Sequence, residues 1–217
     1  MSGTCPFCRA KTPSSDEEDI KQLRPWVKKK KAWAQSHMGQ LYRDGEGVKQ
    51  SYKMAKRLYD LAAQQGDVGS MYNLGVMYEH GLGVERSYER VFEYYEQAAH
   101  LGSAKAQYNL GRLYATGEGV VQSYVRAKSY YEPAAEQGHV DAMFSLACLY
   151  ANGQGVERNL TKARELFTNS AEQGHEIAVK YLKQLDNEER EAAALDPNVI
   201  VCSFCHLPQT PTRSFNK

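Results

Sequence analysis

Two pairs of cysteines near the chain ends are the residues whose type and spacing best suit metal chemistry. Cys5 and Cys8 form one Cys-x-x-Cys pair, and Cys202 and Cys205 form the other. This spacing places two thiolates where a tetrahedral zinc ion takes its ligands. Zinc needs four ligands, whereas each end supplies two, or three if His206 is counted. We therefore expect that folding requires no cofactor, with zinc at these cysteines and free thiols as the two alternatives.

Catalytic patterns are absent from the sequence, which holds no Gly-x-Ser-x-Gly, no P-loop and no dinucleotide-binding glycine pattern. His139 and His175 lie 36 residues apart, each directly after a glycine, which indicates repeat structure rather than a catalytic pair. The run from Cys202 to His206 matches the c-type haem attachment signature, but that chemistry needs export to a haem-loading compartment. The sequence therefore predicts a protein that is not an enzyme.

An internal repeat of 36 residues determines where the other features of the chain lie. Glycines recur at this interval in three series, which are Gly45, Gly81, Gly117 and Gly153, then Gly47, Gly83, Gly119 and Gly155, then Gly66, Gly102, Gly138 and Gly174. A period of this length takes precedence over segment-by-segment interpretation, because it indicates identical supersecondary units that stack on one another.

Each repeat is predicted to contain two helices separated by a glycine loop. The helix from Val68 to Glu79 carries Leu74 and Tyr78 at helical spacing, and we expect both in the core. Gly81 ends this helix, because glycine readily takes the left-handed conformation. A second helix is expected to begin near Tyr88. Its N-cap in the four repeats is predicted to be Ser51, Ser87, Ser123 and Asn159.

Three departures from regular helix chemistry carry structural expectations. A glycine inside a helix costs about 1 kcal/mol relative to alanine, so glycines inside the first helices imply close approach of the partner helix. Lys30 stands where later repeats have a turn glycine, which predicts an irregular start of the first repeat. Pro133 falls inside a second helix, where we expect a kink and a cost of roughly 3 kcal/mol. The positions inside the first helices are Gly39, Gly75, Gly111 and, in the fourth repeat, Ala147.

The repeated pattern resembles the Sel1-like repeat, a relative of the tetratricopeptide repeat. It reads most clearly from Ala106 to Tyr114 and covers about Ala32 to Leu185. The resemblance implies a curved α-solenoid that works as an adaptor in multiprotein complexes. The expected fold class is therefore all-α, a right-handed α-solenoid of about four 36-residue helix-turn-helix repeats plus a capping helix.

The first helices of such a stack line its concave side, so their stripe beside the core is the expected partner-binding surface. Tyrosines there would give rigid apolar contact, and asparagines would bond a peptide backbone or, alternatively, nearby helix groups. The candidate partner-binding residues are Tyr72, Asn73 and Val76, then Tyr108, Asn109 and Arg112, then Phe144 and Ser145, with Cys148 beside them as a groove or packing residue.

The chain divides into a tail at 1–18, a repeat region at 19–185, a capping helix with its end at 186–197, and a second tail at 198–217. Cys5-Pro6-Phe7-Cys8 resembles the last ligand pair of a RING finger, and Cys202-Ser203-Phe204-Cys205 resembles the opening pair of an MYND-type finger. These resemblances imply two incomplete fingers and a chain that is, or descends from, a fragment. One zinc shared by both ends is a further alternative, although solenoid ends generally lie apart.

Charge and hydropathy limit the partners. The 27 basic and 26 acidic residues give a net charge of +1, which argues against a nucleic-acid partner. No run of about 18 apolar residues spans a membrane and no signal peptide is evident, so we expect an intracellular, cytoplasmic protein. The run Lys28–Lys31 is either a solvated turn or a nuclear-import signal.

We expect a scaffold for a partner protein or peptide, with part of a RING-type ubiquitin ligase as the alternative.

Overall fold

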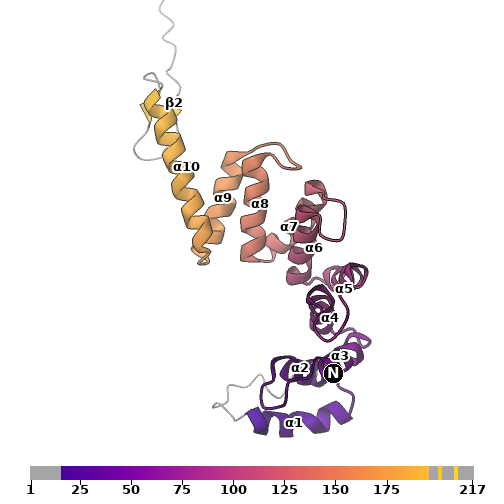
Figure 1. Ribbon diagram of the computed structural model, residues 1–217. Helices are drawn as coiled ribbons and strands as arrows, with labels where there is room; N and C mark the ends of the chain where they lie inside the picture. The colour runs from indigo at the N-terminus through magenta and orange to yellow at the C-terminus, as the bar shows by residue number, and fades with distance from the viewer. Residues whose placement is uncertain (1–15, 196–199, 202–207, 210–217) are drawn as a thin grey trace, which may run out of the picture. The chain divides into compact units, whose positions relative to one another are not determined.

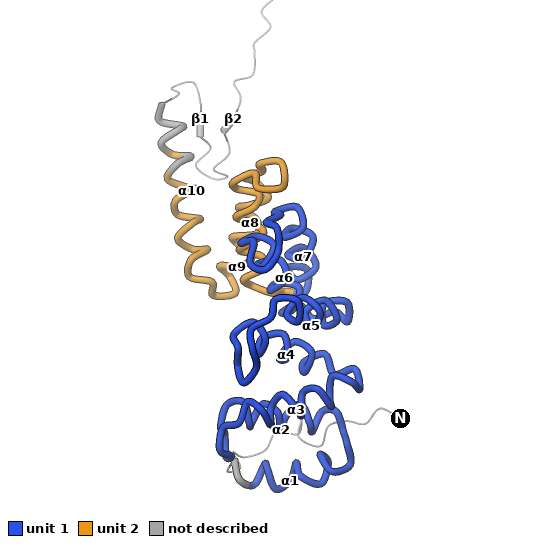
Figure 2. Tube along the Cα trace, turned by 45° about the vertical axis from the view of Figure 1, so that its right-hand side comes forward, with its two compact units in different colours: residues 1–137 blue, residues 138–217 orange. Residues whose placement is uncertain are grey.

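The computed structural model describes residues 16–195, 200–201 and 208–209, which form helices, their connections and one short strand pair (Figure 1). The chain divides into two compact units, unit 1 from Met1 to Gln137 and unit 2 from Gly138 to Lys217 (Figure 2). Within the described part, helices account for nearly all the regular structure, which confirms the all-α solenoid class. No helix among the described residues is both long and apolar enough to cross a lipid bilayer.

Unit 1 contains a leading helix followed by three helical hairpins. Its helices are α1 (Asp16–Lys28), α2 (Ala32–Asp44), α3 (Tyr52–Ala63), α4 (Val68–His80), α5 (Tyr88–His100), α6 (Ala104–Thr116) and α7 (Tyr124–Glu136). The pairs α2 and α3, α4 and α5, and α6 and α7 pack as hairpins, and α3 packs on α4 as α5 packs on α6.

Unit 2 contains the fourth hairpin and a long last helix. Its elements are α8 (Val140–Asn152), α9 (Leu160–Glu172), α10 (Glu176–Leu195) and the strands β1 (Ile200–Val201) and β2 (Pro208–Gln209). The two strands pair antiparallel, with Ile200 opposite Gln209. α10 packs on α9 and runs without interruption through the residues for which a partial repeat and a capping helix were expected.

The helix ends follow the predicted capping chemistry. Each second helix begins after an extended residue whose side chain accepts a hydrogen bond from the backbone N–H three residues later. Such a cap satisfies a backbone donor that would otherwise lack a partner. Each first helix with a glycine loop ends at a residue in the left-handed conformation, with φ between 66° and 78°. The predicted N-caps Ser51, Ser87, Ser123 and Asn159 are confirmed.

An aromatic ring explains the glycines inside the first helices. A Cβ on Gly75 would lie 2.4 Å from the ring of Tyr95, and one on Gly111 would lie 2.5 Å from the ring of Tyr131. These rings are buried, so they cannot move aside without disturbing the core. The expected close approach is confirmed, and its cause is the partner helix's aromatic side chain. In unit 2 the same two positions hold Ala147 and the fully buried Phe167.

Lys30 adopts the conformation of the glycine that it replaces. Its φ is 54°, whereas Gly66, Gly102 and Gly138 have φ between 85° and 88°. The expected irregular start is therefore wrong for the backbone conformation, because Lys30 has a left-handed φ like the glycines at the equivalent positions. A lysine there is strained, since a Cβ crowds the carbonyl oxygen in this region. α1 precedes this turn and buries Leu23 at the position that Tyr59 takes one repeat later.

Pro133 does not interrupt its helix. α7 continues past it to Glu136, and Gln137 donates a backbone hydrogen bond to the Pro133 carbonyl at 3.3 Å. The loss of one backbone hydrogen bond is confined to the last turn, which limits the expected disturbance. Pro25 lies at the equivalent position of α1, three repeat lengths of 36 residues before Pro133, and α1 also runs past its proline to Lys28. The repeat therefore accepts proline at this position.

Candidate functional site

The candidate site is a groove in unit 1 formed by two pockets on α2, α4 and α6. The first pocket has a volume of about 380 Å³ and the second about 290 Å³. Tyr72 lines both pockets, so the two adjoin at its side chain. We call them together the α2–α4–α6 groove. The first is lined by Tyr72, Val76, Glu79, His80, Arg86, Tyr95, Asn109, Arg112 and Glu118, and the second by Gln40, Arg43, Gly69, Tyr72, Asn73, Ser103 and Lys105.

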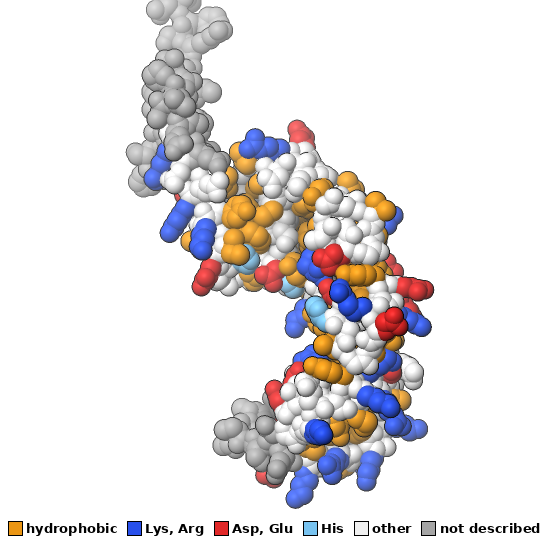
Figure 3. Space-filling model, in the orientation of Figure 1, with side chains coloured by type: hydrophobic (Ala, Val, Ile, Leu, Met, Phe, Trp, Pro, Cys, Tyr) orange, Lys and Arg blue, Asp and Glu red, His pale blue; other side chains and the backbone are white. Residues whose placement is uncertain are grey.

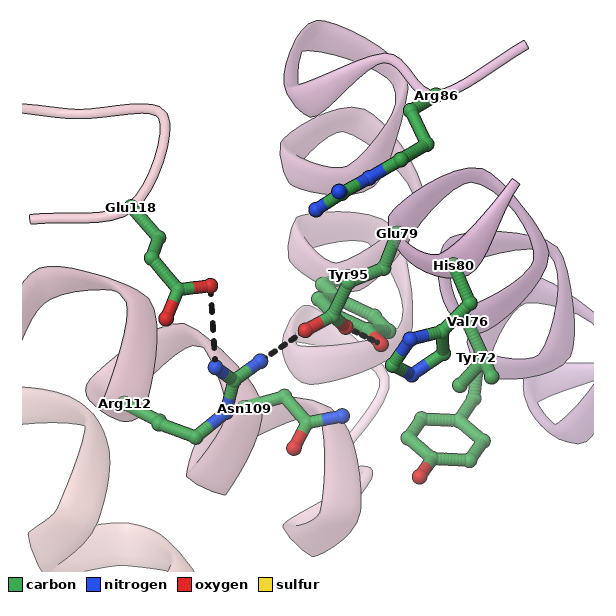
Figure 4. A pocket seen from close by; sticks show the side chains of 9 residues that line it. All are labelled: Tyr72, Val76, Glu79, His80, Arg86, Tyr95, Asn109, Arg112 and Glu118. Carbon is green, nitrogen blue, oxygen red and sulfur yellow. Dashed lines mark hydrogen bonds and ion pairs between the residues drawn. The ribbon is translucent and has the colours of Figure 1, made fainter. Parts of the chain in front are cut away.

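A buried carboxylate organises the first pocket. Glu79 is 6% exposed. One of its oxygens bonds the guanidinium of Arg112, and the other accepts a hydrogen bond of 2.6 Å from the hydroxyl of Tyr95. Figure 4 shows the Arg112 guanidinium between Glu79 and Glu118, with a Glu118 oxygen 3.4 Å away (Figure 4). Glu79 lies on α4, Tyr95 on α5 and Arg112 on α6. This cluster therefore joins the second repeat to the third.

Burial and charge shift the ionisation of the groups around Glu79. Burial raises the pKa of the Tyr95 phenol well above its usual value, and the bond to Glu79 raises it further. Burial alone would lower the pKa of Arg112, but the charges of Glu79 and Glu118 raise it overall. Tyr95 therefore stays protonated as a donor and Arg112 stays charged. Both oxygens of Glu79 have partners, which does not suit a general base.

The second pocket contains two cations with different surroundings. Arg43 donates to both carboxylate oxygens of Asp44, at 2.7 and 2.8 Å, and to the Asn73 side-chain oxygen at 3.0 Å. This bonding raises the pKa of Arg43 and lowers the pKa of Asp44. Lys105 is exposed at the first turn of α6. Asn73 gives its oxygen to Arg43, which leaves its amide N–H groups for a ligand.

Tyr59 shows how the aromatic position differs between repeats. It is fully buried against Gly39 as Tyr95 is against Gly75. Position 79 is Glu, whereas the equivalent position beside Tyr59 is Arg43. Burial raises the pKa of Tyr59 to about 12, and no described group accepts a hydrogen bond from its hydroxyl. The second repeat thus gives its tyrosine a carboxylate partner, which the first repeat does not.

The structure gathers most of the predicted partner-binding residues in unit 1. Tyr72, Val76, Asn109 and Arg112 line the first pocket, and Tyr72 and Asn73 line the second. Tyr108 lines neither pocket, and its ring centroid lies 5.9 Å from that of Tyr131. Phe144 and Ser145 lie on α8 in unit 2.

The expected division of the first helix into a core stripe and a groove stripe needs correction. Tyr78 is half-buried rather than a core residue, and it stacks on Tyr94 with ring centroids 5.8 Å apart. Tyr72 is also half-buried, and its ring stacks on Tyr95 at 5.7 Å. Leu74 is fully buried, as predicted. Tyr72 therefore has one side against the core and another side on the groove.

Unit 2 presents an aromatic cluster at the corresponding place. The ring of Phe144 lies 5.5 Å from those of Phe167 and Tyr181 and 4.4 Å from the imidazole of His175. Figure 3 shows hydrophobic side chains gathered over α8, α9 and α10 on the visible face of unit 2 (Figure 3). His175 and His139 are N-caps, since each Nδ1 accepts from a backbone N–H, at 3.1 and 3.3 Å. This agrees with their interpretation as repeat structure.

Sequence reasoning missed four charged residues of the groove. These are Glu79 and Glu118, which hold Arg112, and Arg86 and Lys105, which stand at the pockets. A comparison of the repeats for positions that differ would have found two of them. The equivalents of Glu79 are Arg43, Ala115 and Ala151, and the equivalents of Lys105 are Trp33, Gly69, Asp141 and Ile177.

The predicted zinc ligands Cys5, Cys8, Cys202 and Cys205 lie outside the described residues. In the part of the chain that the structure describes, no group of three or more His, Cys, Asp or Glu side chains could hold a metal ion. Cys148 on α8 is half-buried, and burial raises the pKa of its thiol to about 11. It therefore stays a protonated thiol at neutral pH, in keeping with a packing role.

Comparison with known proteins identifies the repeat. The Sel1 repeat family model matches residues 34–67, 68–103, 104–139 and 140–175, a span that includes neither terminal cysteine pair. A search of the curated proteins finds no match. The chain is similar in structure to a Sel1 repeat protein from Oxalobacter formigenes, with 34% identity, a TM-score of 0.75, and coverage of 80% of this chain and 50% of that one.

Two further solved structures are similar. A protective antigen of uropathogenic Escherichia coli with an SLR fold shows 31% identity and a TM-score of 0.75, over 79% of this chain and 37% of that chain. An immunity protein from Pseudomonas aeruginosa shows 23% identity and a TM-score of 0.56, over 79% of this chain and 62% of that chain, which supports the fold alone. The chain thus spans half or less of the length of the first two proteins.

Proposed function

Because this chain belongs to the Sel1 repeat family, we propose that it is a non-enzymatic scaffold that binds an extended segment of a partner protein in the α2–α4–α6 groove. The observation that carries the proposal is the pair of adjoining pockets that share Tyr72. Two adjoining pockets suit a peptide better than a compact metabolite, since successive side chains enter successive pockets.

The residues of the groove support binding rather than catalysis. Tyr72 offers a rigid ring that is already fixed by stacking on Tyr95, so little side-chain entropy is lost when a partner contacts it. Asn73 and Asn109 offer amide groups beside that ring. Glu79, the one buried carboxylate among the described residues, has both oxygens engaged. These features favour recognition of a partner's backbone and side chains.

The cysteine pairs enter this proposal only as separate elements. The match to the repeat family supports the scaffold and does not extend to Cys5, Cys8, Cys202 or Cys205. Zinc at these residues, and the RING-like and MYND-like resemblances, stay predictions. The proposed groove function does not depend on them, because every residue of the groove lies within unit 1.

Blocking the groove with a bulky side chain tests the proposal. Gln40 is exposed and lines the second pocket, so Gln40→Trp should fill that pocket without entering the core. We expect the variant to lose at least about tenfold in affinity for partners captured from a cell extract, or about 1.4 kcal/mol. Pull-down followed by titration of the recovered partner measures this, with the melting temperature recorded on the same samples.

The matched control is Lys53→Trp, which places the same ring on the exposed face of α3. It should bind partners as the parent protein does. A double variant, Tyr72→Ala with Tyr108→Ala, should also bind more weakly, because Tyr72 is lost from both pockets, although both rings pack on core tyrosines and their loss also lowers stability. Unchanged capture by a folded Gln40→Trp variant would contradict the groove assignment.

A further inference from the structure

The charges of the groove do not balance. Its lining holds the cations Arg43, Arg86, Arg112 and Lys105 and the anions Glu79 and Glu118. Both anions bond Arg112, and Arg43 is paired with Asp44. No described carboxylate lies within ion-pair distance of Arg86 or Lys105. With Asp44 counted, the four cations face three anions, so the groove carries one net positive charge, and Arg86 and Lys105 are its two cations without a carboxylate.

The two cations without a carboxylate lie in different pockets. Arg86 follows α4 and reaches into the first pocket, where its guanidinium donates only to the hydroxyl of Tyr88 at 3.1 Å among the described residues (Figure 4). Lys105 lines the second pocket together with the free amide of Asn73. Both cations belong to exposed residues, whereas Tyr72 between the pockets is half-buried. The groove thus presents one such cation in each pocket beside the shared ring of Tyr72, and in the first pocket Glu118 accepts a 3.4 Å hydrogen bond from the same Tyr88 hydroxyl.

Resting on the proposed function, we propose that the groove selects acidic peptide segments, in which carboxylate side chains flank an apolar residue. One carboxylate pairs with Lys105 and the Asn73 amide in the second pocket, and the other pairs with Arg86 in the first. The apolar residue packs on Tyr72 where the pockets adjoin. A basic segment is rejected, because a like charge beside Lys105 meets no carboxylate among the residues that line the second pocket.

Hydrogen-bond inventory supports the same choice. Asn73 presents donors, since its oxygen is occupied by Arg43. Lysine and arginine side chains carry donors and no acceptor. The polar groups of the second pocket that are free to bind a ligand are therefore mainly donors, and a carboxylate is the peptide side chain that accepts most hydrogen bonds.

The test uses the full chain and three short fluorescent peptides that share a Leu-Phe core. The flanking residues are Glu in one peptide, Gln in the second and Lys in the third, and binding is measured by fluorescence anisotropy. We expect the Glu peptide to bind at least about tenfold more tightly than the Lys peptide, with the Gln peptide between them. Its affinity should fall as salt is raised, because salt screens exposed charges.

Two charge reversals and one matched control locate the effect. Lys105→Glu and Arg86→Glu should each weaken binding of the Glu peptide about tenfold or more and strengthen binding of the Lys peptide. Lys53→Glu makes the same change on α3, outside the groove, and should alter neither affinity by more than about twofold. All three residues are exposed, so the variants should fold.

The outcomes separate this inference from the function on which it rests. Equal binding of the three peptides that Gln40→Trp abolishes would overturn the acidic preference and leave the groove as a binding surface. Preference for the Lys peptide, or a Glu preference that Lys53→Glu removes as fully as Lys105→Glu does, would also overturn the inference. If no peptide binds and Gln40→Trp still recovers every partner, both the inference and the proposed function are wrong.

Discussion

The second repeat in unit 1 and the fourth repeat in unit 2 share one helical-hairpin architecture, but the surface of the second is polar and that of the fourth is aromatic. In the second repeat Gly75 faces Tyr95, whose hydroxyl reaches Glu79 and the Arg112 cluster. In the fourth, Ala147 stands at the glycine position and Phe167 replaces the tyrosine. Phe167 has no hydroxyl to satisfy, and the neighbouring surface is an aromatic cluster around Phe144.

This difference shows which positions carry fold and which carry surface chemistry. Turn glycines, N-caps and the buried ring repeat in all four hairpins, because each hairpin buries the same face. The equivalents of Glu79 and Arg112 do not repeat, since no packing requirement fixes them. In the second repeat the buried carboxylate of Glu79 accepts hydrogen bonds from Tyr95 and Arg112. The packing interface between the helices therefore also forms one wall of a polar pocket.

The largest effect should come from breaking the polar cluster. Arg112→Ala leaves Glu79 buried without its counter-charge, and we expect a loss of about 3 kcal/mol in the free energy of unfolding, the low end for a buried pair because Arg112 is 29% exposed. Arg90→Ala removes an ion pair that lies on the surface and should leave the melting temperature nearly unchanged. Urea denaturation compares the two, and equal effects would mean that the cluster has no special role.

Removing the hydroxyl of the buried tyrosine should change the free energy of unfolding differently in the first and second repeats. Tyr95→Phe deletes a hydrogen bond to a charged acceptor and should cost about 2 kcal/mol. Tyr59→Phe deletes a buried hydroxyl without a described partner, so it should be neutral or stabilising. The same denaturation measurement applies. A cost for Tyr59→Phe as large as that for Tyr95→Phe would show that the two tyrosines are equivalent.

Replacing the glycine that packs on the buried ring should destabilise the protein, although alanine is normally favoured over glycine in a helix. Gly75→Ala gains about 1 kcal/mol of helix propensity, yet its Cβ would lie 2.4 Å from the Tyr95 ring. We expect a net loss of about 1 to 2 kcal/mol from overpacking. Ala147→Gly, the opposite change in unit 2, should lose about 1 kcal/mol through propensity alone. Thermal melting distinguishes these, and a stabilising Gly75→Ala would contradict the packing account.

Relieving the strained turn before α2 should raise the stability of the protein by a small amount. Lys30→Gly permits the φ of 54° without a Cβ and should stabilise the protein by about 1 kcal/mol. Lys29→Gly, next to it, has no positive φ to relieve and should not stabilise. A rise in melting temperature for both variants, or for neither, would show that backbone strain at Lys30 is not the cause.

Removal of metal should have the smallest effect. The described core of both units is built from helix packing, so a strong chelator should leave the melting temperature unchanged within error. Inductively coupled plasma analysis of the untreated protein reports whether zinc is bound at all. A large loss of melting temperature with chelator would show that Cys5, Cys8, Cys202 and Cys205 contribute to the fold.

The repeat made the fold predictable from the sequence, and the groove only partly so. Glycine spacing and caps such as Ser87 act locally, so they predict helix ends correctly. Lys30 and Pro133 were harder, because a residue disfavoured on average is tolerated where the surrounding turn fixes its conformation. Tyr72, Asn73, Val76, Asn109 and Arg112 were predicted from helix faces, whereas the ion cluster arises from contacts between repeats that no single repeat contains.

Photo-crosslinking from the groove tests the central claim most directly. A benzophenone amino acid placed at Gln40 lies at the second pocket, and the same residue placed at Lys53 lies on α3. Irradiation in a cell extract should give discrete adducts from position 40 that Lys105→Glu weakens, and none of these from position 53. If position 40 yields no adducts and position 53 does, the partner binds elsewhere and the α2–α4–α6 groove is not the binding surface.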